Sequence, residues 1–262
     1  MLGLFRKRQN SEPITRAVPE GQRVYAIGDI HGCLGLLDDL VGQIEADDRA
    51  RGTAQTQLVF LGDLVDRGPD SAGVVDRLIG LAEARGNVRF ILGNHEEIFL
   101  RSLAGDMESL RLFVRIGGRE TILSYGVSEH DFERTDYTEL LALLQAHVPQ
   151  RHIAFLEAFE DRIEIGDYVF VHAGLRPGVP IEDQKRADMR WIRSSFLDSD
   201  AEFGKLVVHG HSISDGVIER PNRIGLDTGA FATGRLSAIG LEGTDRWFLS
   251  AEAGRAAPAA LV

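Results

Sequence analysis

Short apolar segments of this chain repeatedly run into Asp, Asn or His. Five segments end this way: VYAI (24–27) before Asp29 and His31, LVFL (58–61) before Asp63, VRFIL (88–92) before Asn94, YVFV (168–171) before His172, and LVV (206–208) before His209 and His211. Carboxylate and amide oxygens with imidazole nitrogens, without thiolates, are ligands for divalent metals such as Mn, Fe and Zn. Each residue alone also suits a cap, a turn or a buried histidine. Five such endings in one chain favour a metal site.

The elements that position these residues follow from the hydrophobic pattern. The five apolar segments have the length and the β-branched or aromatic content of buried strands. Amphipathic helical patterns cover residues 34–46 and 71–84, between the first three segments. This alternation predicts right-handed crossovers and a largely parallel sheet, in which the carboxyl ends of the strands line one crevice. We therefore expect the polar residues to converge.

The remaining chain departs from that alternation. Residues 96–160 read as a helical insertion within one domain, broken at Gly117-Gly118 and restarted after Pro149. Short apolar runs near 217–219, 223–226, 236–241 and 246–250, separated by turn residues, predict antiparallel strands in a second sheet or at an edge. The predicted organisation is a flexible leader at 1–22, a single domain at 23–250 and a tail at 251–262.

Composition excludes several classes of protein. Among the 262 residues, 40 acidic side chains outnumber 29 basic ones, so a general basic surface for nucleic acid is missing. Cys33 is the single cysteine and cannot form an internal disulfide, which favours a reducing, cytoplasmic setting. The basic cluster at 6–8 is not followed by the apolar segment of a secretory signal, and no apolar run could span a bilayer. We expect neither a nucleic-acid nor a membrane partner, and the oligomeric state stays open.

The polar endings belong to motifs with a known order. GDIHG (28–32), GDLVDRG (62–68) and GNHE (93–96), followed by VHAG (171–174) and GHS (210–212), resemble the signature of phosphoprotein phosphatases within the calcineurin-like metallophosphoesterases. The resemblance covers residues 23–250. It implies an α/β fold, a sandwich of two mixed β-sheets flanked by helices, with a helical insertion.

The resemblance also implies a two-metal mechanism. Two divalent ions, with manganese the first expectation and iron or zinc the alternatives, would activate a bridging hydroxide for direct attack on phosphorus, so that no phosphoenzyme forms. The implied metal ligands are Asp29 and His31 for the first ion, Asp63 for both, and Asn94, His172 and His211 for the second.

Four further residues receive catalytic roles from the same resemblance. His95 would act as general acid and Asp66 would orient it, whereas Arg67 and Arg193 would bind the phosphate. A surface ion pair is the alternative for Asp66, and a helix-surface arginine is the alternative for Arg193.

Two nearby polar residues are less clear. His211 is preferred to His209 as a ligand because related bacterial proteins read GHT at this point. Asp227 is interpreted as a turn residue.

The predicted function is metal-dependent hydrolysis of phosphomonoesters, first of all as a bacterial-type protein serine/threonine phosphatase. Its partner would be a phosphorylated protein or a small phosphoester. The nearest alternative is a symmetrical bis(5'-nucleosyl)-tetraphosphatase, but those enzymes typically read ARG and GNHD, where this chain has Asp66 and Glu96. A non-catalytic phosphate-binding regulator is disfavoured because every catalytic position is filled. The helical insertion is expected to shape the entrance and the selectivity of the site.

Overall fold

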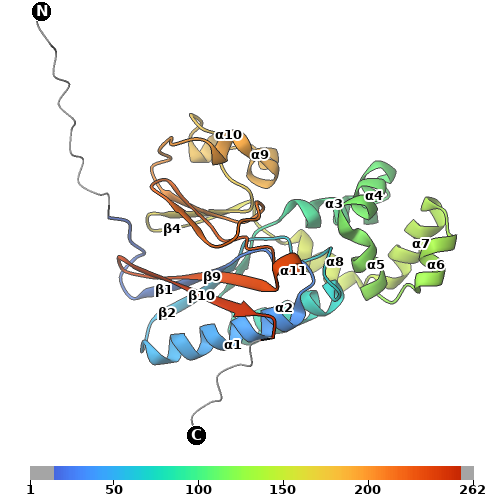
Figure 1. The fold of residues 1–262 in the computed structure, drawn as a ribbon, viewed down its shortest axis with the longest axis horizontal. Coiled ribbons are helices and arrows are strands. Elements are labelled where there is room, and N and C mark those ends of the chain that lie inside the picture. Colours follow the sequence, from blue (N-terminus) through green and yellow to red (C-terminus); the bar gives the residue numbers. More distant parts are fainter. Residues whose placement is uncertain (1–14, 255–262) are drawn as a thin grey trace, which may run out of the picture.

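Two five-stranded β-sheets face each other in the computed structural model, which describes residues 15–254 (Figure 1). The first sheet has the order β10-β9-β1-β2-β3, formed by Asp245–Glu252, Arg235–Glu242, Gln22–Ile27, Gln55–Phe60 and Val88–Phe90. The second has the order β4-β5-β6-β8-β7, formed by Arg162–Ile165, Tyr168–Val171, Leu206–His209, Arg223–Gly225 and Ile218–Arg220. The predicted sandwich of two mixed sheets is confirmed.

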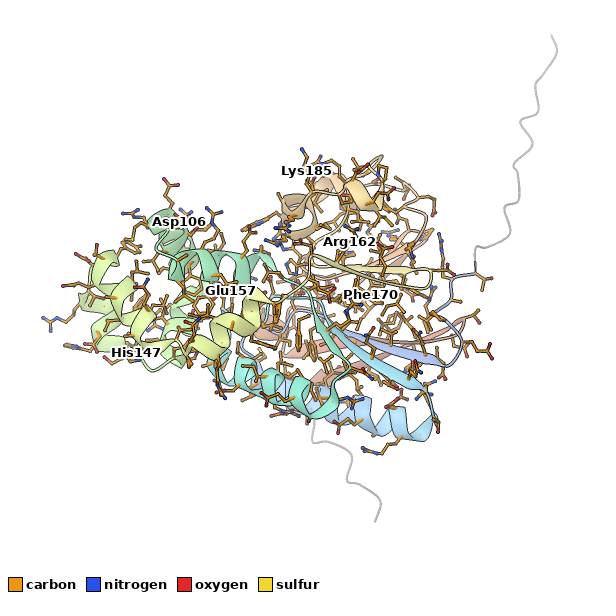
Figure 2. All side chains as sticks on the ribbon, turned by 180° about the vertical axis from the view of Figure 1, so that it is seen from behind. Asp106, His147, Glu157, Arg162, Phe170 and Lys185 are labelled. Carbon is orange, nitrogen blue, oxygen red and sulfur yellow. The ribbon has the colours of Figure 1, made fainter. Side chains whose placement is uncertain are left out.

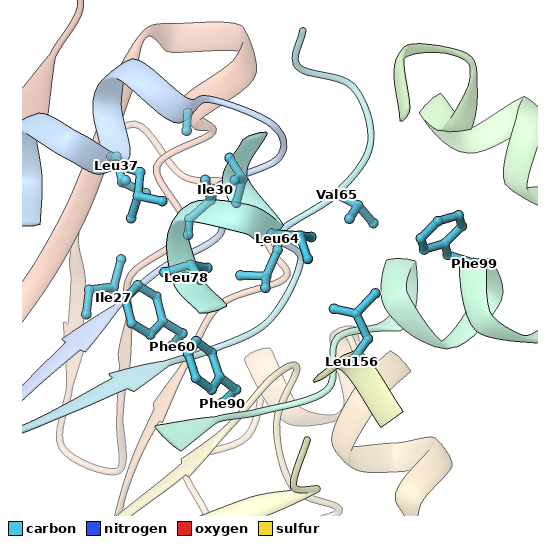
Figure 3. Close-up of a cluster of buried hydrophobic side chains, with 14 of the residues drawn as sticks. Ile27, Ile30, Leu37, Phe60, Leu64, Val65, Leu78, Phe90, Phe99 and Leu156 are labelled. Atoms are coloured by element: carbon cyan, nitrogen blue, oxygen red, sulfur yellow. The ribbon is translucent and has the colours of Figure 1, made fainter. Parts of the chain in front are cut away.

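The first sheet is buried on both faces. Strands β1, β2 and β3 run parallel, and α1 (Leu34–Ala50) and α2 (Ser71–Arg85) cross over between them. Because strand side chains alternate, Leu58 and Phe60 pack towards the helices, whereas Val59 packs towards the second sheet. Figure 3 shows the helix-side cluster around the Phe60 ring, which stacks on Phe90 with centroids 5.2 Å apart.

The second sheet is covered on its outer face by two short helices. These are α9 (Arg186–Trp191) and α10 (Ser194–Leu197), above the sandwich in Figure 1. Tyr168 and Phe170 of β5 face the first sheet, whereas Val169 packs with Phe196 of α10. Two layers of helices therefore enclose two layers of sheet.

The predicted helical insertion forms a lobe beside the sandwich. It consists of α3 (Asn94–Leu103), α4 (Met107–Phe113), the π-helical turn η1 (Val114–Gly118), α5 (Arg119–Ser124), α6 (Glu129–Arg134), α7 (Tyr137–His147) and α8 (Gln150–Glu157). Seen from behind, Asp106 and His147 lie on this lobe, away from Phe170 of the sandwich (Figure 2). The break expected at Gly117 is present, with φ of 120°, and Pro149 caps α8.

The last strands largely agree with the prediction, because β7 pairs antiparallel with β8 in the second sheet and β10 pairs antiparallel with β9 at the edge of the first. Strands β9 and β10 join the first sheet, where β9 lies antiparallel to β1, and β8 lies parallel to β6 in the second. A hydrophobic pattern gives the period of a strand but not its neighbour, and this assignment depends on contacts across the whole chain. The remaining elements are the 3₁₀ turn η2 (Ile181–Asp183) and helix α11 (Ala230–Thr233).

The ends of the folded region also differ from the prediction. Val18 is buried and its N–H donates to Gly243 at 2.9 Å, so the packed chain starts before Arg23. Strand β10 continues to Glu252, and Ala251 is buried. The rest of the predicted leader (1–14) and tail (255–262) lies outside the described residues. Within residues 15–254, no helix is long and apolar enough to cross a membrane.

Candidate metal centre

The carboxyl ends of strands from both sheets meet and bring the predicted ligands together. Two groups have ligand atoms within 4.8 Å of one another: His31, Asp63 and His95, and Asp63, His172 and His211. Asp63 belongs to both. The predicted convergence therefore occurs, but between the ends of two facing sheets instead of along one.

In the second group, acceptor atoms face one another. Nδ1 of His172 lies 2.8 Å from the carbonyl oxygen of Leu61, which fixes a proton on that nitrogen, so that in the neutral imidazole Nε2 carries the lone pair. That Nε2 lies 2.9 Å from Oδ1 of Asn94 and 3.2 Å from Nδ1 of His211. Nε2 of His211 is buried without a partner. A cation would satisfy this arrangement, and the donors suit a divalent metal.

The first group is built in the same way. Nδ1 of His31 lies 2.7 Å from the carbonyl oxygen of Val65, so Nε2 faces Oδ2 of Asp63 at 3.6 Å. Asp29 lies beside both groups: it follows β1 two residues before His31, and its Oδ2 accepts the backbone N–H of His211, a member of the second group, at 2.8 Å. Its Oδ1 is buried without a hydrogen-bond partner. The residues present thus fit two adjacent cations.

Protein groups balance the charges in the centre only in part. Burial, together with the charges of Asp227 and Asp63, raises the pKa of Asp29 well above its usual value. Burial acts in the same direction on Asp63, but the nearby imidazoles of His172 and His95 hold the pKa of Asp63 well below its usual value. Burial lowers the pKa of His31 to about 3. A neutral imidazole is the form that binds a metal.

Asp227 adds to this negative charge. Its Oδ1 accepts the N–H of Gly229 at 2.9 Å, which agrees with the predicted turn. Its side chain is nevertheless buried, and its charge acts on Asp29.

Backbone strain is concentrated in the site. Among the described residues, five non-glycine residues have positive φ, namely His31 (46°), Asp63 (49°), Asp66 (73°), Arg67 (68°) and His211 (65°). All five are predicted site residues, and strain of this kind costs about 1–3 kcal/mol per residue. The glycines of the motifs leave no space for a side chain: a Cβ on Gly210 would lie 1.9 Å from Oδ1 of Asp29.

His95 and Asp66, the residues predicted to transfer a proton, form a buried pair beside the metal centre. Nδ1 of His95 lies 2.6 Å from Oδ2 of Asp66, and both side chains are almost fully buried. Asp66 is therefore not a surface ion pair. Burial lowers the pKa of His95, but the charges of Asp63 and Asp66 outweigh it and raise the pKa above the usual value. The pair leaves Nε2 of His95 facing Asp63, 3.9 Å from its Oδ2.

The two predicted phosphate-binding arginines differ in how firmly they are held. Nη2 of Arg67 lies 3.2 Å from Nε2 of His95, and its guanidinium lies 4.8 Å from the centre of the Phe231 ring. Arg193 is exposed, and its charge helps to lower the pKa of His211, after the larger effects of burial and His172. Both arginines thus lie at the site, one fixed and one on its rim.

His209 points away from the acceptor groups. Its ring packs edge-on against Phe196 with centroids 5.1 Å apart, and its Nδ1 lies 3.0 Å from the carbonyl oxygen of Gly210. This position agrees with the preference for His211 as the ligand.

Two residues that the motif assignment left without a role hold the site in place. Glu96 accepts the backbone N–H groups of Asp63 at 2.8 Å and Leu64 at 2.7 Å, and so fixes the loop that follows β2. Thr121, in α5 of the insertion, donates to Oδ1 of Asp66 at 2.7 Å and accepts its N–H at 2.8 Å. Glu96 lies within the GNHE motif, but nothing in the sequence around Thr121 indicated its contact.

Comparison with known proteins agrees with this geometry. The family model for calcineurin-like phosphoesterases matches residues 22–230. A symmetrical bis(5'-nucleosyl)-tetraphosphatase from Janthinobacterium sp. (strain Marseille) is 26% identical, over 85% of this chain and 93% of its own length. The asymmetrical bis(5'-nucleosyl)-tetraphosphatase PrpE of Anoxybacillus flavithermus is also 26% identical, over 81% of this chain and 88% of its own. A solved structure of a candidate diadenosine tetraphosphatase superposes with a TM-score of 0.61 and 25% identity, covering 92% of this chain and 100% of that one.

Proposed function

Because the chain belongs to the calcineurin-like phosphoesterase family, we propose that this metal-dependent phosphoesterase hydrolyses dinucleoside tetraphosphates symmetrically, into two nucleoside diphosphates. The observation that carries the substrate class is the match, over nearly the whole length, to a relative named for that reaction. The metal centre supports the chemistry, since two sets of buried acceptor atoms share Asp63.

The residues of the chain would divide the work as follows. Two bound divalent ions would supply Lewis-acid stabilisation of the phosphoryl group and would lower the pKa of a water molecule. The residues that would hold them are Asp29, His31, Asp63, Asn94, His172 and His211. Arg67 and Arg193 would bind the phosphate oxygens, which suit the guanidinium fork.

Proton transfer would fall to His95. As the oxygen of water bonds to phosphorus and the bridging P–O bond breaks, the water would release one proton to solvent and a proton on Nε2 of His95 would pass to the leaving phosphate oxygen. Asp66 keeps the imidazole in place through its 2.6 Å contact with Nδ1. The raised pKa of His95 favours the protonated form in the protein without bound metal.

The order of the two predicted substrates is therefore reversed. The motifs favoured a protein serine/threonine phosphatase, whereas relatives that match most of the chain are named as dinucleoside tetraphosphatases. One observation keeps phosphoserine and phosphothreonine as the second candidate. The Asp66–His95 pair is an acid built to protonate a leaving group, and an alkoxide needs that proton more than a phosphate leaving group does.

Product analysis separates the candidates. Purified protein, chelated and reloaded with manganese, should convert diadenosine tetraphosphate to two ADP faster than it dephosphorylates phosphoserine or phosphothreonine peptides. Formation of AMP and ATP would instead indicate asymmetrical cleavage. Faster turnover of the peptides would overturn the proposal.

The variant His95→Asn sharpens this test. It should lower phosphopeptide turnover more than dinucleotide turnover, because only the peptide leaves as an alkoxide, and metal content should stay intact. Unchanged turnover of both substrates would show that the acid assignment is wrong.

A further inference from the structure

A hollow of about 770 Å³ lies beside the metal centre. Its walls come from the start of α1, the loop after Arg67, helix α11 and the end of β10. Leu34, Leu36, Pro69 and Phe231 give it an apolar lining. Through Gly32 and Phe231 the hollow adjoins His31 and Arg67, so it offers room for a group attached to a phosphate that binds at the centre.

Phe231 connects the hollow to the centre. Its ring packs edge-on against the imidazole of His31, with centroids 5.3 Å apart, and lies under the guanidinium of Arg67 at 4.8 Å. The same half-buried ring lines the hollow. One aromatic side chain therefore touches a predicted metal ligand and a predicted phosphate-binding residue, and also faces the space beyond them.

The charge of the hollow excludes a second phosphate as its occupant. The described residues that line it include no lysine or arginine but several carboxylates. Asp38 is paired with Arg77 at 2.6 Å, and Oδ1 of Asp70 accepts the N–H of Gly73 at 2.8 Å. Asp39 has no hydrogen-bond or ion-pair partner within the part of the chain that the structure describes. The hollow thus offers an aromatic face and one carboxylate free to accept a hydrogen bond.

Cys33 also lines the hollow. Its thiol lies 3.4 Å from the carbonyl oxygen of His31, and burial raises its pKa to about 11. It therefore remains a neutral thiol that packs as a small apolar group.

We propose that this hollow binds a nucleobase of the dinucleotide, with Phe231 as its aromatic platform and Asp39 as the acceptor for an exocyclic amine. The inference rests on the proposed function, because it assigns a place to the nucleoside next to the reacting phosphate. A neutral, planar group with N–H donors matches the lining, and bases stack on aromatic side chains without a need for cationic neighbours.

The first test is kinetic. Phe231→Leu should raise KM for diadenosine tetraphosphate about 10-fold, the loss expected for one stacked base. The loss on 4-nitrophenyl phosphate, which has no nucleoside, should be much smaller than the loss on the dinucleotide. Phe231→Tyr should keep the wild-type KM. The matched control is Phe248→Leu, since Phe248 is also partly exposed but lines a different hollow. This variant should change neither KM for the dinucleotide nor turnover of 4-nitrophenyl phosphate.

Two kinetic outcomes would overturn the inference. An unchanged KM for the dinucleotide in Phe231→Leu would show that Phe231 does not stack on a base. Equal losses on both substrates would show that Phe231 supports His31 instead of binding a base.

The second test measures how much the exocyclic amine contributes to binding, and it does not depend on turnover. Calorimetric titration with adenosine and with inosine, which lacks the exocyclic amine, should favour adenosine in the wild type, because a carboxylate rejects the inosine oxygen. Asp39→Asn should abolish that preference. If the wild type binds adenosine but does not cleave diadenosine tetraphosphate, the proposed function fails and the subsite stands.

Cleavage without adenosine binding would instead overturn the subsite alone. A preference for phosphopeptides with an adjacent arginine, lost in Asp39→Asn but kept in Phe231→Leu, would also overturn it. In that case the hollow would accept a basic side chain.

Discussion

Strand β1 carries a buried charged residue near each end, Arg23 and Asp29, and the polar clusters around the two differ in how they are satisfied. At the start of the strand, the guanidinium of Arg23 donates to both carboxylate oxygens of Glu242 at 3.0 Å and to Asp48 at 2.7 Å. It also donates to backbone carbonyl oxygens of Asp48 and Gly52. Beyond the strand, Oδ1 of Asp29 has no partner. The first cluster is complete within the protein, whereas the second is not.

This difference distinguishes a structural cluster from a binding site. Burial of a charge is tolerated when the protein supplies its partners, and an orphaned buried atom needs a reason. The Arg23 cluster holds α1 and β9 to β1 and contains no non-glycine residue with positive φ, whereas all five such residues among those described lie in the metal centre. The missing partners of Asp29 and His211 therefore coincide with the backbone strain, at the place where a ligand would complete the structure.

The largest expected effect comes from altering the incomplete cluster. Asp29→Asn should lower turnover of 4-nitrophenyl phosphate by about 10³-fold, because metal ions contribute several kcal/mol to transition-state stabilisation. It should also stabilise the chelated protein by about 1 kcal/mol, since the raised pKa means that ionised Asp29 is unfavourable in the fold. Activity assays, metal analysis and urea unfolding of the chelated protein measure both effects. If Asp29→Asn were less stable than the wild type after chelation, Asp29 would be satisfied within the protein and the two clusters would not differ.

The complete cluster should respond in the opposite way. Arg23→Met leaves Glu242 and Asp48 without their shared partner and should destabilise the protein by about 3 kcal/mol. Turnover at a temperature where the variant is folded should stay within about twofold. The control Arg246→Met removes an exposed pair with Glu219 and should cost less than about 1 kcal/mol by urea unfolding.

A third polar cluster, around His152 of the insertion, should make the stability of the protein depend on pH. Nδ1 of His152 lies 3.0 Å from the hydroxyl of Tyr125, its Nε2 lies 3.1 Å from Asp76, and burial lowers its pKa to about 4. The unfolded chain takes up a proton near pH 6.5 while the folded protein does not. The stability contributed by neutral His152 is therefore present above about pH 6.5 and is lost as pH falls towards 4.

The expected loss between pH 7 and pH 5 is about 2 kcal/mol. His152→Gln, which cannot titrate, should show a shallower decline over the same interval in urea unfolding. Parallel curves for the two proteins would contradict the prediction.

The smallest expected effect concerns the contact between the insertion and the loop that carries Asp66. Thr121→Val removes the hydroxyl that donates to Asp66 and should destabilise the protein by about 1 kcal/mol. Turnover should fall by about fivefold, because Asp66 is then less firmly placed beside His95. Thr121→Ser should restore both. A stability loss with unchanged turnover would show that the insertion only packs against this loop.

Much of the fold was predictable because it rests on local periodicity. The segment YVFV coincides with β5, the helical patterns at 34–46 and 71–84 lie inside α1 and α2, and the Gly117 break is present. The sheet that receives β9 and β10 was not predictable, because side-chain alternation is the same in either sheet. The start of the packed chain was also misplaced, since the burial of Val18 depends on its contacts with distant strands.

By itself, the sequence determined the chemistry of this protein: the ligand types, their positions after buried strands and the glycines that allow close approach. Tertiary structure decided which atoms remain unsatisfied, which charges Arg23 neutralises and that Thr121 reaches Asp66 across 55 positions of chain. The physical reason is that ligand type and strand period are local properties of a sequence. Hydrogen-bond satisfaction and charge balance instead depend on which distant segments the folded chain brings into contact.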